Sequence, residues 1–86
     1  MALRTLLLPW KPLVGKELKK LRISLGLSQP KFAHRYGFNL ASLRKWEQGN
    51  AIPEQVTAMF LLCIKQDPEG IARAVAKLRA NPKNFL

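Results

Sequence analysis

Residues 27–49 read LSQPKFAHRYGFNLASLRKWEQG and contain the signals for two short helices joined by a tight turn. Ser28 is a good N-cap, and Pro30 is tolerated in a first helical turn because an amide proton there would have no helical partner. Gly37 can adopt the left-handed conformation that ends a helix. These signals predict a helix over residues 29–36, and its inner face should be formed by Phe32, Ala33 and Tyr36.

A second helix of this pair is predicted directly after the turn. Asn39 can cap its start, and Gly49 can end it in the same left-handed conformation as Gly37. Apolar side chains recur at every third position between these two residues, which is typical of a helix with one buried face. They are Leu40, Leu43 and Trp46.

The chain before this pair predicts a basic amphipathic helix that ends at Gly26. Its apolar residues fall at i, i+4, i+7 and i+11, and they are Val14, Leu18, Leu21 and Leu25. Its other faces carry basic side chains, which are Lys16, Lys19, Lys20 and Arg22.

The chain after Gly49 predicts two further helices. Residues 53–54, Pro-Glu, open the first, whose apolar stripe should be Val56, Met59, Phe60, Cys63 and Ile64. Residues 67–69, Asp-Pro-Glu, open the second, whose inner face should be Ile71, Val75 and Leu78. Residues 81–82, Asn-Pro, end it.

No segment has the pattern of a β-strand, so the expected fold is all-α. Five short helices with a glycine turn between the second and the third are the arrangement of a helix-turn-helix domain. A chain of 86 residues has room for one hydrophobic core. We expect one domain over residues 14–80, a short N-terminal arm over residues 1–13 and a C-terminal tail over residues 81–86.

The charge favours a polyanion as the partner. Fifteen Lys and Arg residues against five Asp and Glu residues give a net charge of +10. Residues 1–45 contribute ten basic groups and one acidic group (+9), whereas residues 46–86 contribute five basic and four acidic groups (+1). We therefore expect the first half to contact the anion, and the second half to complete the core or bind a partner.

The sequence resembles the XRE family of phage-repressor-like helix-turn-helix domains over about residues 15 to 65. The matching residues are Leu27-Ser28-Gln29, Phe32-Ala33, Gly37-Phe38-Asn39, Leu43, Trp46-Glu47-Gln48-Gly49 and Pro53. The segments at 15–18, Gly-Lys-Glu-Leu, and at 67–69 are more narrowly similar to HigA-type antitoxins. Stand-alone phage and plasmid regulators share most of these features, so they remain the alternative.

The resemblance implies which residues contact DNA. Gln29 matches a glutamine that contacts phosphate and orients the recognition helix, unless it merely begins a helix. Arg44 is the best candidate for a base contact, because its planar fork can pair with guanine N7 and O6 together, with a phosphate contact as the alternative. Asn39 and Ser42 match polar positions that cap the helix or contact the DNA backbone, and we expect capping to be their main role. The full expected set is Ser28, Gln29, Asn39, Leu40, Ala41, Ser42, Arg44 and Lys45.

Other positions of the motif have apolar or structural roles. Leu40 and Ala41 offer only apolar contact, for example to a thymine methyl group, and Leu40 could equally face the core. In the family, the aromatic at Trp46 packs beneath the recognition helix, and the glutamate at Glu47 binds nearby backbone or a basic side chain. The loop at 50–52 lacks the basic residue that often precedes the proline, which weakens the expectation of backbone contacts there.

The sequence contains no catalytic set, so an enzyme is not expected. The five carboxylates are scattered, and His34, expected on the surface, has no nucleophile at motif spacing. One histidine and one cysteine cannot form a metal-ligand set, and no cofactor is expected. Cys63 cannot form an internal disulfide and is expected in the core, which is consistent with the reducing cytoplasm.

Membrane and RNA binding are remote alternatives. No apolar run approaches the length of a transmembrane helix, and the basic first helix lacks the aromatic residues of membrane-surface helices. RNA binding would need exposed aromatic platforms, but the aromatic residues here fall at core positions.

The expected function is that of a DNA-binding transcriptional regulator, a homodimer on an inverted-repeat operator in double-stranded DNA. By resemblance, it would be the antitoxin of a type II pair, neutralising a RelE-like toxin and repressing its own operon. The apolar arm would either fold back across its own helices or dock on the toxin or the other subunit. Its candidate partner-binding residues are Leu3, Leu6, Leu7, Leu8 and Trp10.

Overall fold

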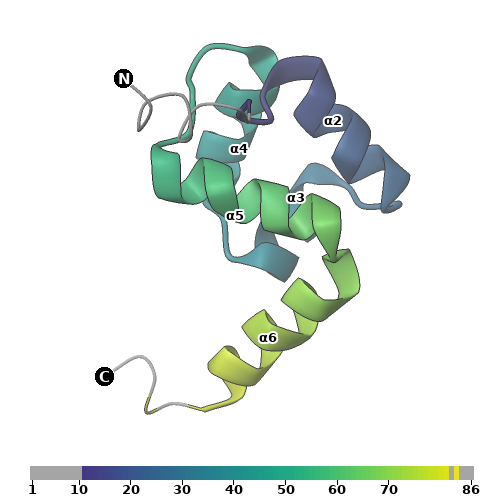
Figure 1. Ribbon diagram of the computed structural model, residues 1–86, viewed down its shortest axis with the longest axis vertical. Coiled ribbons are helices and arrows are strands. Elements are labelled where there is room, and N and C mark those ends of the chain that lie inside the picture. Colours follow the sequence, from purple (N-terminus) through teal and green to yellow (C-terminus); the bar gives the residue numbers. More distant parts are fainter. Residues whose placement is uncertain (1–10, 82, 84–86) are drawn as a thin grey trace, which may run out of the picture.

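The computed structural model describes residues 11–81 and 83, which form five α-helices and no β-strand (Figure 1). The helices are α2 (Gly15–Ser24), α3 (Gln29–Tyr36), α4 (Leu40–Gln48), α5 (Gln55–Gln66) and α6 (Pro68–Ala80). The all-α prediction is confirmed, and each helix begins and ends within about two residues of its sequence signals.

The ends of α3 and α4 are set by the local chemistry that the sequence predicts. Ser28 Oγ accepts the backbone N–H of Lys31 at 3.2 Å, and Asn39 Oδ1 accepts that of Ser42 at 3.0 Å. Gly37 and Gly49 end the two helices with φ of 82° and 79°, a region that costs residues with a Cβ atom about 1 kcal/mol or more. Both the turn and its flanking helices are therefore determined locally.

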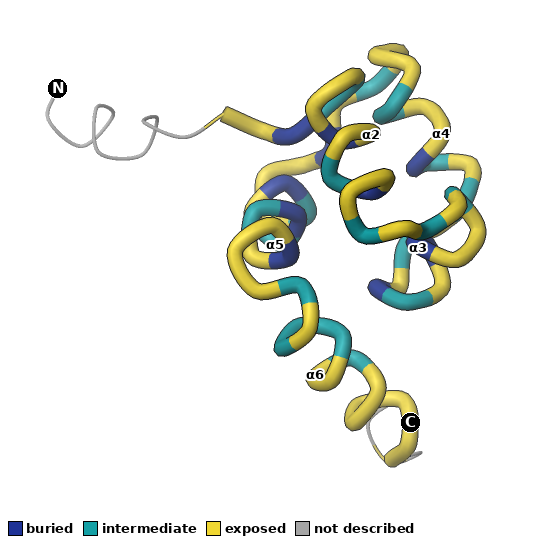
Figure 2. Tube along the Cα trace, turned by 90° about the vertical axis from the view of Figure 1, so that its right-hand side faces the viewer, coloured by how far each residue is buried: buried dark blue, intermediate teal, exposed yellow. Residues whose placement is uncertain are grey.

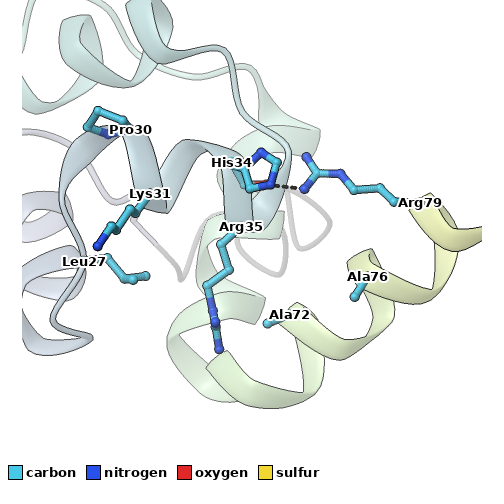
Figure 3. A pocket seen from close by; sticks show the side chains of 8 residues that line it. All are labelled: Leu27, Pro30, Lys31, His34, Arg35, Ala72, Ala76 and Arg79. Carbon is cyan, nitrogen blue, oxygen red and sulfur yellow. Dashed lines mark hydrogen bonds between the residues drawn. The ribbon is translucent and has the colours of Figure 1, made fainter.

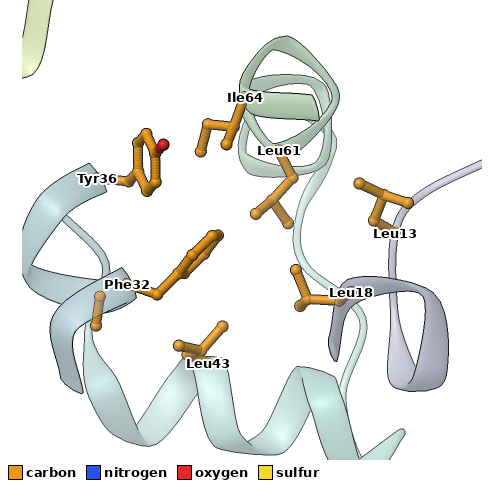
Figure 4. Close-up of a cluster of buried hydrophobic side chains, with 8 residues drawn as sticks. Leu13, Leu18, Phe32, Tyr36, Leu43, Leu61 and Ile64 are labelled. Atoms are coloured by element: carbon orange, nitrogen blue, oxygen red, sulfur yellow. The ribbon is translucent and has the colours of Figure 1, made fainter. Parts of the chain in front are cut away.

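The core lies between α2, α3, α4 and α5, whose apolar side chains point toward one another (Figure 4). The largest fully buried side chains are Leu18, Phe32, Leu43, Leu61 and Ile64. The predicted inner face of α3 is confirmed, since Phe32, Ala33 and Tyr36 are all buried. Leu13 is buried as well, so the chain already packs into the core at the end of the expected arm.

The turn between α3 and α4 is held to the core by Phe38. Its ring centroid lies 5.9 Å from that of Phe32, 5.6 Å from that of Trp46 and 5.6 Å from that of Phe60. These distances are in the favourable range for aromatic pairs. Trp46 is half-buried against the core, as expected for the aromatic beneath the recognition helix. The orientation of α4 relative to α3 is thus fixed by side chains from three helices.

The predicted apolar stripe of α5 is wrong in part. Val56, Met59 and Cys63 are exposed, with Val56 77% exposed, whereas the buried residues of α5 are Ala58, Leu61 and Ile64. Cys63 is therefore a surface residue and not a core residue. The reason is that α5 is apolar on nearly every side, so helical spacing alone fits more than one stripe.

The predicted position of Arg22 is also wrong. Its expected place is on the basic outer faces of α2, but the residue lies four positions after Leu18, at the edge of the apolar stripe, and is only 8% exposed. It is buried because an acidic partner, Glu47 of α4, meets it there. Charged side chains are almost never buried without such a partner.

The last helix, α6, packs on α3 and α5 and extends away from the four-helix core (Figure 2). The hydroxyl of Tyr36 donates to the backbone oxygen of Pro68 at 3.0 Å and ties the start of α6 to α3. Ile71 and Val75 are half-buried, but Leu78, predicted on the inner face, is exposed because the later turns of α6 project beyond the core.

The candidate partner-binding residues of the arm, Leu3, Leu6, Leu7, Leu8 and Trp10, lie outside the described residues. Within the described part of the chain, no helix has the length and apolar character needed to cross a membrane.

Candidate nucleic-acid interface

One face of α4 is open to solvent along the whole helix. Its exposed residues recur at i, i+3, i+4 and i+7, and they are Ala41, Arg44, Lys45 and Gln48. Leu43 and Trp46 occupy the opposite side and face the core. With nine residues and a rise of about 1.5 Å each, α4 is about 13 Å long, which is comparable to the width of about 12 Å of a DNA major groove.

Several residues of the expected DNA-contacting set serve the fold. The side-chain oxygens of Ser28 and Asn39 are engaged in the caps of α3 and α4. Leu40 is half-buried and packs against the core, which was the alternative to a contact with a thymine methyl group. Ser42 is half-buried, and its backbone N–H is the donor to Asn39. Ser28 thus caps α3, Asn39 caps α4 at the N–H of Ser42, and Leu40 packs on the core, whereas Ala41, Arg44 and Lys45 are exposed on the surface of α4.

Gln29, the first residue of α3, connects α3 to α4. Its Nε2 donates to Glu47 Oε1 at 3.1 Å, and its Oε1 accepts Nε–H of Arg44 at 3.4 Å. Because Glu47 accepts from the nitrogen end of the amide, the oxygen end is directed toward Arg44. The contact uses only Nε of Arg44, so the two terminal nitrogens of the guanidinium are not part of it.

Glu47 is itself held by a buried ion pair with Arg22. Arg22 Nε and Nη2 donate to the two carboxylate oxygens at 2.7 Å and 2.9 Å, a two-point arrangement that fixes both groups. The side chains are only 10% and 4% exposed. Arg22 Nη1 also donates to the backbone oxygen of Leu27 at 2.9 Å, just before α3.

The hydrogen bonds accepted by Glu47 raise the pKa of Arg22 above its ordinary value and outweigh burial, which acts to lower it. The pair therefore joins α2, α4 and the segment leading into α3. A continuous line of contacts runs from buried Arg22 through Glu47 and Gln29 to exposed Arg44. Such an arrangement can hold a surface side chain in place for a ligand.

Two members of this interface were missed by the sequence reasoning. Gln48 lies four residues after Arg44 on the exposed face, so its helical position could have identified it. Arg22 lies four residues after Leu18 and three before Leu25, so its position at the edge of the apolar stripe was a signal, although nothing in α2 identifies Glu47 as its partner. The expectation that Glu47 binds a basic side chain is confirmed, and its partner is Arg22.

The titratable side chains near α3 and α4 are mainly cationic. Among residues 11–81 and 83, no group of three or more His, Cys, Asp or Glu side chains is placed to hold a metal ion. His34 lies exposed on α3. The exposed cations Lys31, Arg44 and Lys45 are the prominent charges near the start of α3 and along α4.

Comparisons with known proteins identify a relative with the same architecture. No protein-family model and no curated protein significantly matches the chain. Among solved structures, it is similar to the crystal structure of an HTH XRE-family-like protein from Agrobacterium tumefaciens, with 40% sequence identity and a TM-score of 0.67. The match covers 76% of this chain and 98% of that protein.

Proposed function

The chain belongs to the XRE-like family of helix-turn-helix proteins, and on this premise we propose that it is a sequence-specific DNA-binding transcriptional regulator. The observation that carries the proposal is the exposed face of α4, on which Arg44 is held by Gln29 and, through it, by the buried pair of Glu47 and Arg22. A base-contacting side chain needs such support, because its position must be fixed before binding.

Base recognition is assigned to the exposed face of α4. Arg44 can pair through its guanidinium with guanine N7 and O6, the commonest specific contact in the major groove. Ala41 can contact a thymine methyl group, and Lys45 and Gln48 can contact phosphates or neighbouring bases. The start of α3, with Lys31 exposed beside it, is assigned to the DNA backbone.

The active form is proposed to be a homodimer on an inverted repeat, because one short helix contacts too few bases for useful specificity. The exposed apolar side chains of α5 supply a surface for it. Val56, Met59 and Cys63 recur at i, i+3 and i+7, and Ile52, 72% exposed, lies four residues before Val56. Each copy has a net charge of +10, so two copies repel one another except where they meet through an uncharged surface. Residues 55–64 carry no charge, and this surface of α5 therefore suits contact with a second copy.

The test is selection of binding sites from random double-stranded DNA by the full chain. We expect enrichment of an inverted repeat whose half-site centres lie about one helical turn apart, a footprint over both half-sites, and a dimer in light scattering. A single asymmetric half-site bound by a monomer would contradict the dimer. Absence of any enriched sequence, or a preference for single-stranded RNA over duplex DNA, would contradict the function itself.

The finer function proposed is that of the antitoxin of a type II pair, which neutralises a RelE-like toxin and represses its own operon. The similarity of residues 15–18 and 67–69 to HigA-type antitoxins supports it. The test is to express the neighbouring reading frame alone and together with this chain. We expect the product of the neighbouring frame to arrest growth and this chain to relieve the arrest. If that product is harmless, the antitoxin role is contradicted and the protein is a stand-alone repressor.

A further inference from the structure

A groove of about 560 Å³ lies between α3 and α6, on residues that the DNA-binding proposal does not use apart from Lys31 (Figure 3). Its described lining comes from the segment before α3, from α3 itself and from α6, and not from α4. The lining residues are Leu27, Pro30, Lys31, His34, Arg35, Ala72, Ala76 and Arg79.

The groove combines an apolar surface with a cationic rim. Leu27, Pro30, Ala72 and Ala76 contribute only carbon side chains, whereas Lys31, Arg35 and Arg79 contribute three positive charges. The carboxylate of Glu69 pairs with Arg35 at 3.0 Å but is not part of the lining. Excess positive charge therefore surrounds the apolar surface.

Contacts between α3 and α6 hold the two sides of the groove in place. The Tyr36 hydroxyl is bonded to the Pro68 backbone oxygen at one end, and Arg79 donates to the backbone oxygen of His34 at the other. The groove follows α6 from Ala72 to Arg79, about two helical turns or roughly 10 Å. An elongated occupant fits this shape better than a compact one.

We propose that this groove binds a short acidic segment of a partner protein, whose apolar side chain packs on Leu27, Ala72 and Ala76 while its carboxylates pair with Lys31, Arg35 and Arg79. A DNA backbone offers phosphates for the cations but no aliphatic side chain for the apolar surface. A second copy of this chain, with a net charge of +10, is also a poor match for the rim. The inference does not depend on the proposed DNA-binding function.

The experiment is selection of short random peptides, displayed on phage, against the full chain. We expect the enriched peptides to carry two or more Asp or Glu residues flanking a Leu, Ile or Phe residue. Their binding should shift the backbone NMR signals of Leu27, Ala72 and Ala76. Failure to enrich peptides of this composition overturns the proposal.

Three variants then locate the site of the selected peptides. Ala76→Trp fills the groove, and Arg79→Glu reverses a rim charge, and each should weaken peptide binding about tenfold or more. Arg73→Glu is the matched control, since Arg73 is exposed on the same helix but does not line the groove. This control should bind the peptides nearly as well as the parent protein.

Three results would overturn the assignment of the groove. Equal weakening by Arg73→Glu and Arg79→Glu would mean that the peptides respond only to net charge. Unchanged peptide binding by Ala76→Trp, with its helical content and melting temperature retained, would place the peptides elsewhere. If Arg79→Glu leaves peptide binding unchanged but lowers duplex DNA affinity more than Arg73→Glu does, the groove belongs to the DNA surface.

Discussion

At the scale of single residues, the decisive feature is that an exposed side chain is supported by a buried one. Arg22 and Glu47 form a two-point ion pair. The amide group of Gln29 connects this pair to Arg44, since its nitrogen donates to Glu47 and its oxygen accepts from Arg44. A buried pair of charges need not stabilise a fold relative to apolar residues, but removal of one partner is costly. The pair is therefore best understood as fixing geometry.

Glu47→Gln should destabilise the protein by about 2 kcal/mol or more, because Arg22 would keep its buried charge with a neutral and weaker acceptor. Urea unfolding followed by circular dichroism measures this change. Glu17→Gln is the control, since its pair with Lys20 is largely exposed and should contribute less than about 0.5 kcal/mol. Equal effects of the two substitutions would contradict the structural role of Glu47.

Arg44→Ala should lower operator affinity by about 1 to 3 kcal/mol and relax the preference at one base pair, whereas Gln29→Ala should relax the preference at the same base pair by less, because it removes the support of Arg44 but leaves its guanidinium in place. Binding-site selection with each variant distinguishes the two roles. Lys45→Ala, on the neighbouring position of the same face, is the control for loss of one positive charge. If Arg44→Ala keeps the sequence preference of the parent, Arg44 does not contact a base.

At the scale of the elements, α3 and α4 are helices defined by their own ends, whereas α5 depends on its neighbours for its orientation. The caps at Ser28 and Asn39 and the left-handed glycines at 37 and 49 act within about four residues. The α5 sequence, in contrast, is apolar on several sides, and its contacts with α2, α3 and α4 decide that Leu61 and Ile64 are buried. The remaining apolar stripe is left on the surface.

Val56→Glu should convert the proposed dimer to a monomer, because it places a charge in each half of the α5 contact. Its melting temperature as a monomer should change little, since Val56 is 77% exposed. Light scattering measures the oligomeric state, and Gln55→Glu, one position away, is the control for the added charge. A dimer that survives Val56→Glu would exclude this surface of α5 as the interface.

At the scale of the whole molecule, positive charge is concentrated in the half that contains α2, α3 and the first six residues of α4. The net charge is +9 over residues 1–45 and +1 over residues 46–86. This asymmetry gives long-range attraction to polyanions on the side that presents Arg44 and Lys45, and leaves α5 able to approach another protein.

Operator affinity should fall steeply with salt, because each phosphate neutralised by a cation releases counterions. With about five phosphate contacts per dimer, log affinity against log salt should have a slope near −0.9 per contact. A titration between about 50 and 200 mM salt measures the slope. A flat dependence would indicate that a protein, and not DNA, is the main ligand.

Deletion of residues 1–10 should leave the melting temperature and operator affinity nearly unchanged while weakening neutralisation of the toxin. The physical reason is that, among the described residues, the chain joins the core at Leu13, which clusters with Leu18, Leu61 and Ile64. Thermal unfolding and rescue of growth measure the two effects. Gross destabilisation of the truncated protein would instead assign the arm to the core.

The sequence by itself determined the five helices, their ends and the helix-turn-helix pair. It could do so because a capping oxygen, a proline in a first turn or a glycine with positive φ acts on backbone within a few residues of itself. The exposed positions of α4 followed from the same local regularity, since Leu43 and Trp46 mark the side that faces the core.

Only the tertiary structure decided which face of α5 is buried, why Arg22 leaves the solvent and how Gln29 meets Arg44. Each of these depends on groups distant in the sequence, such as Arg22 and Glu47, which are 25 residues apart. The periodicity of one helix describes its own faces but not the helix that will cover them, and a charge is buried only where the fold supplies its partner.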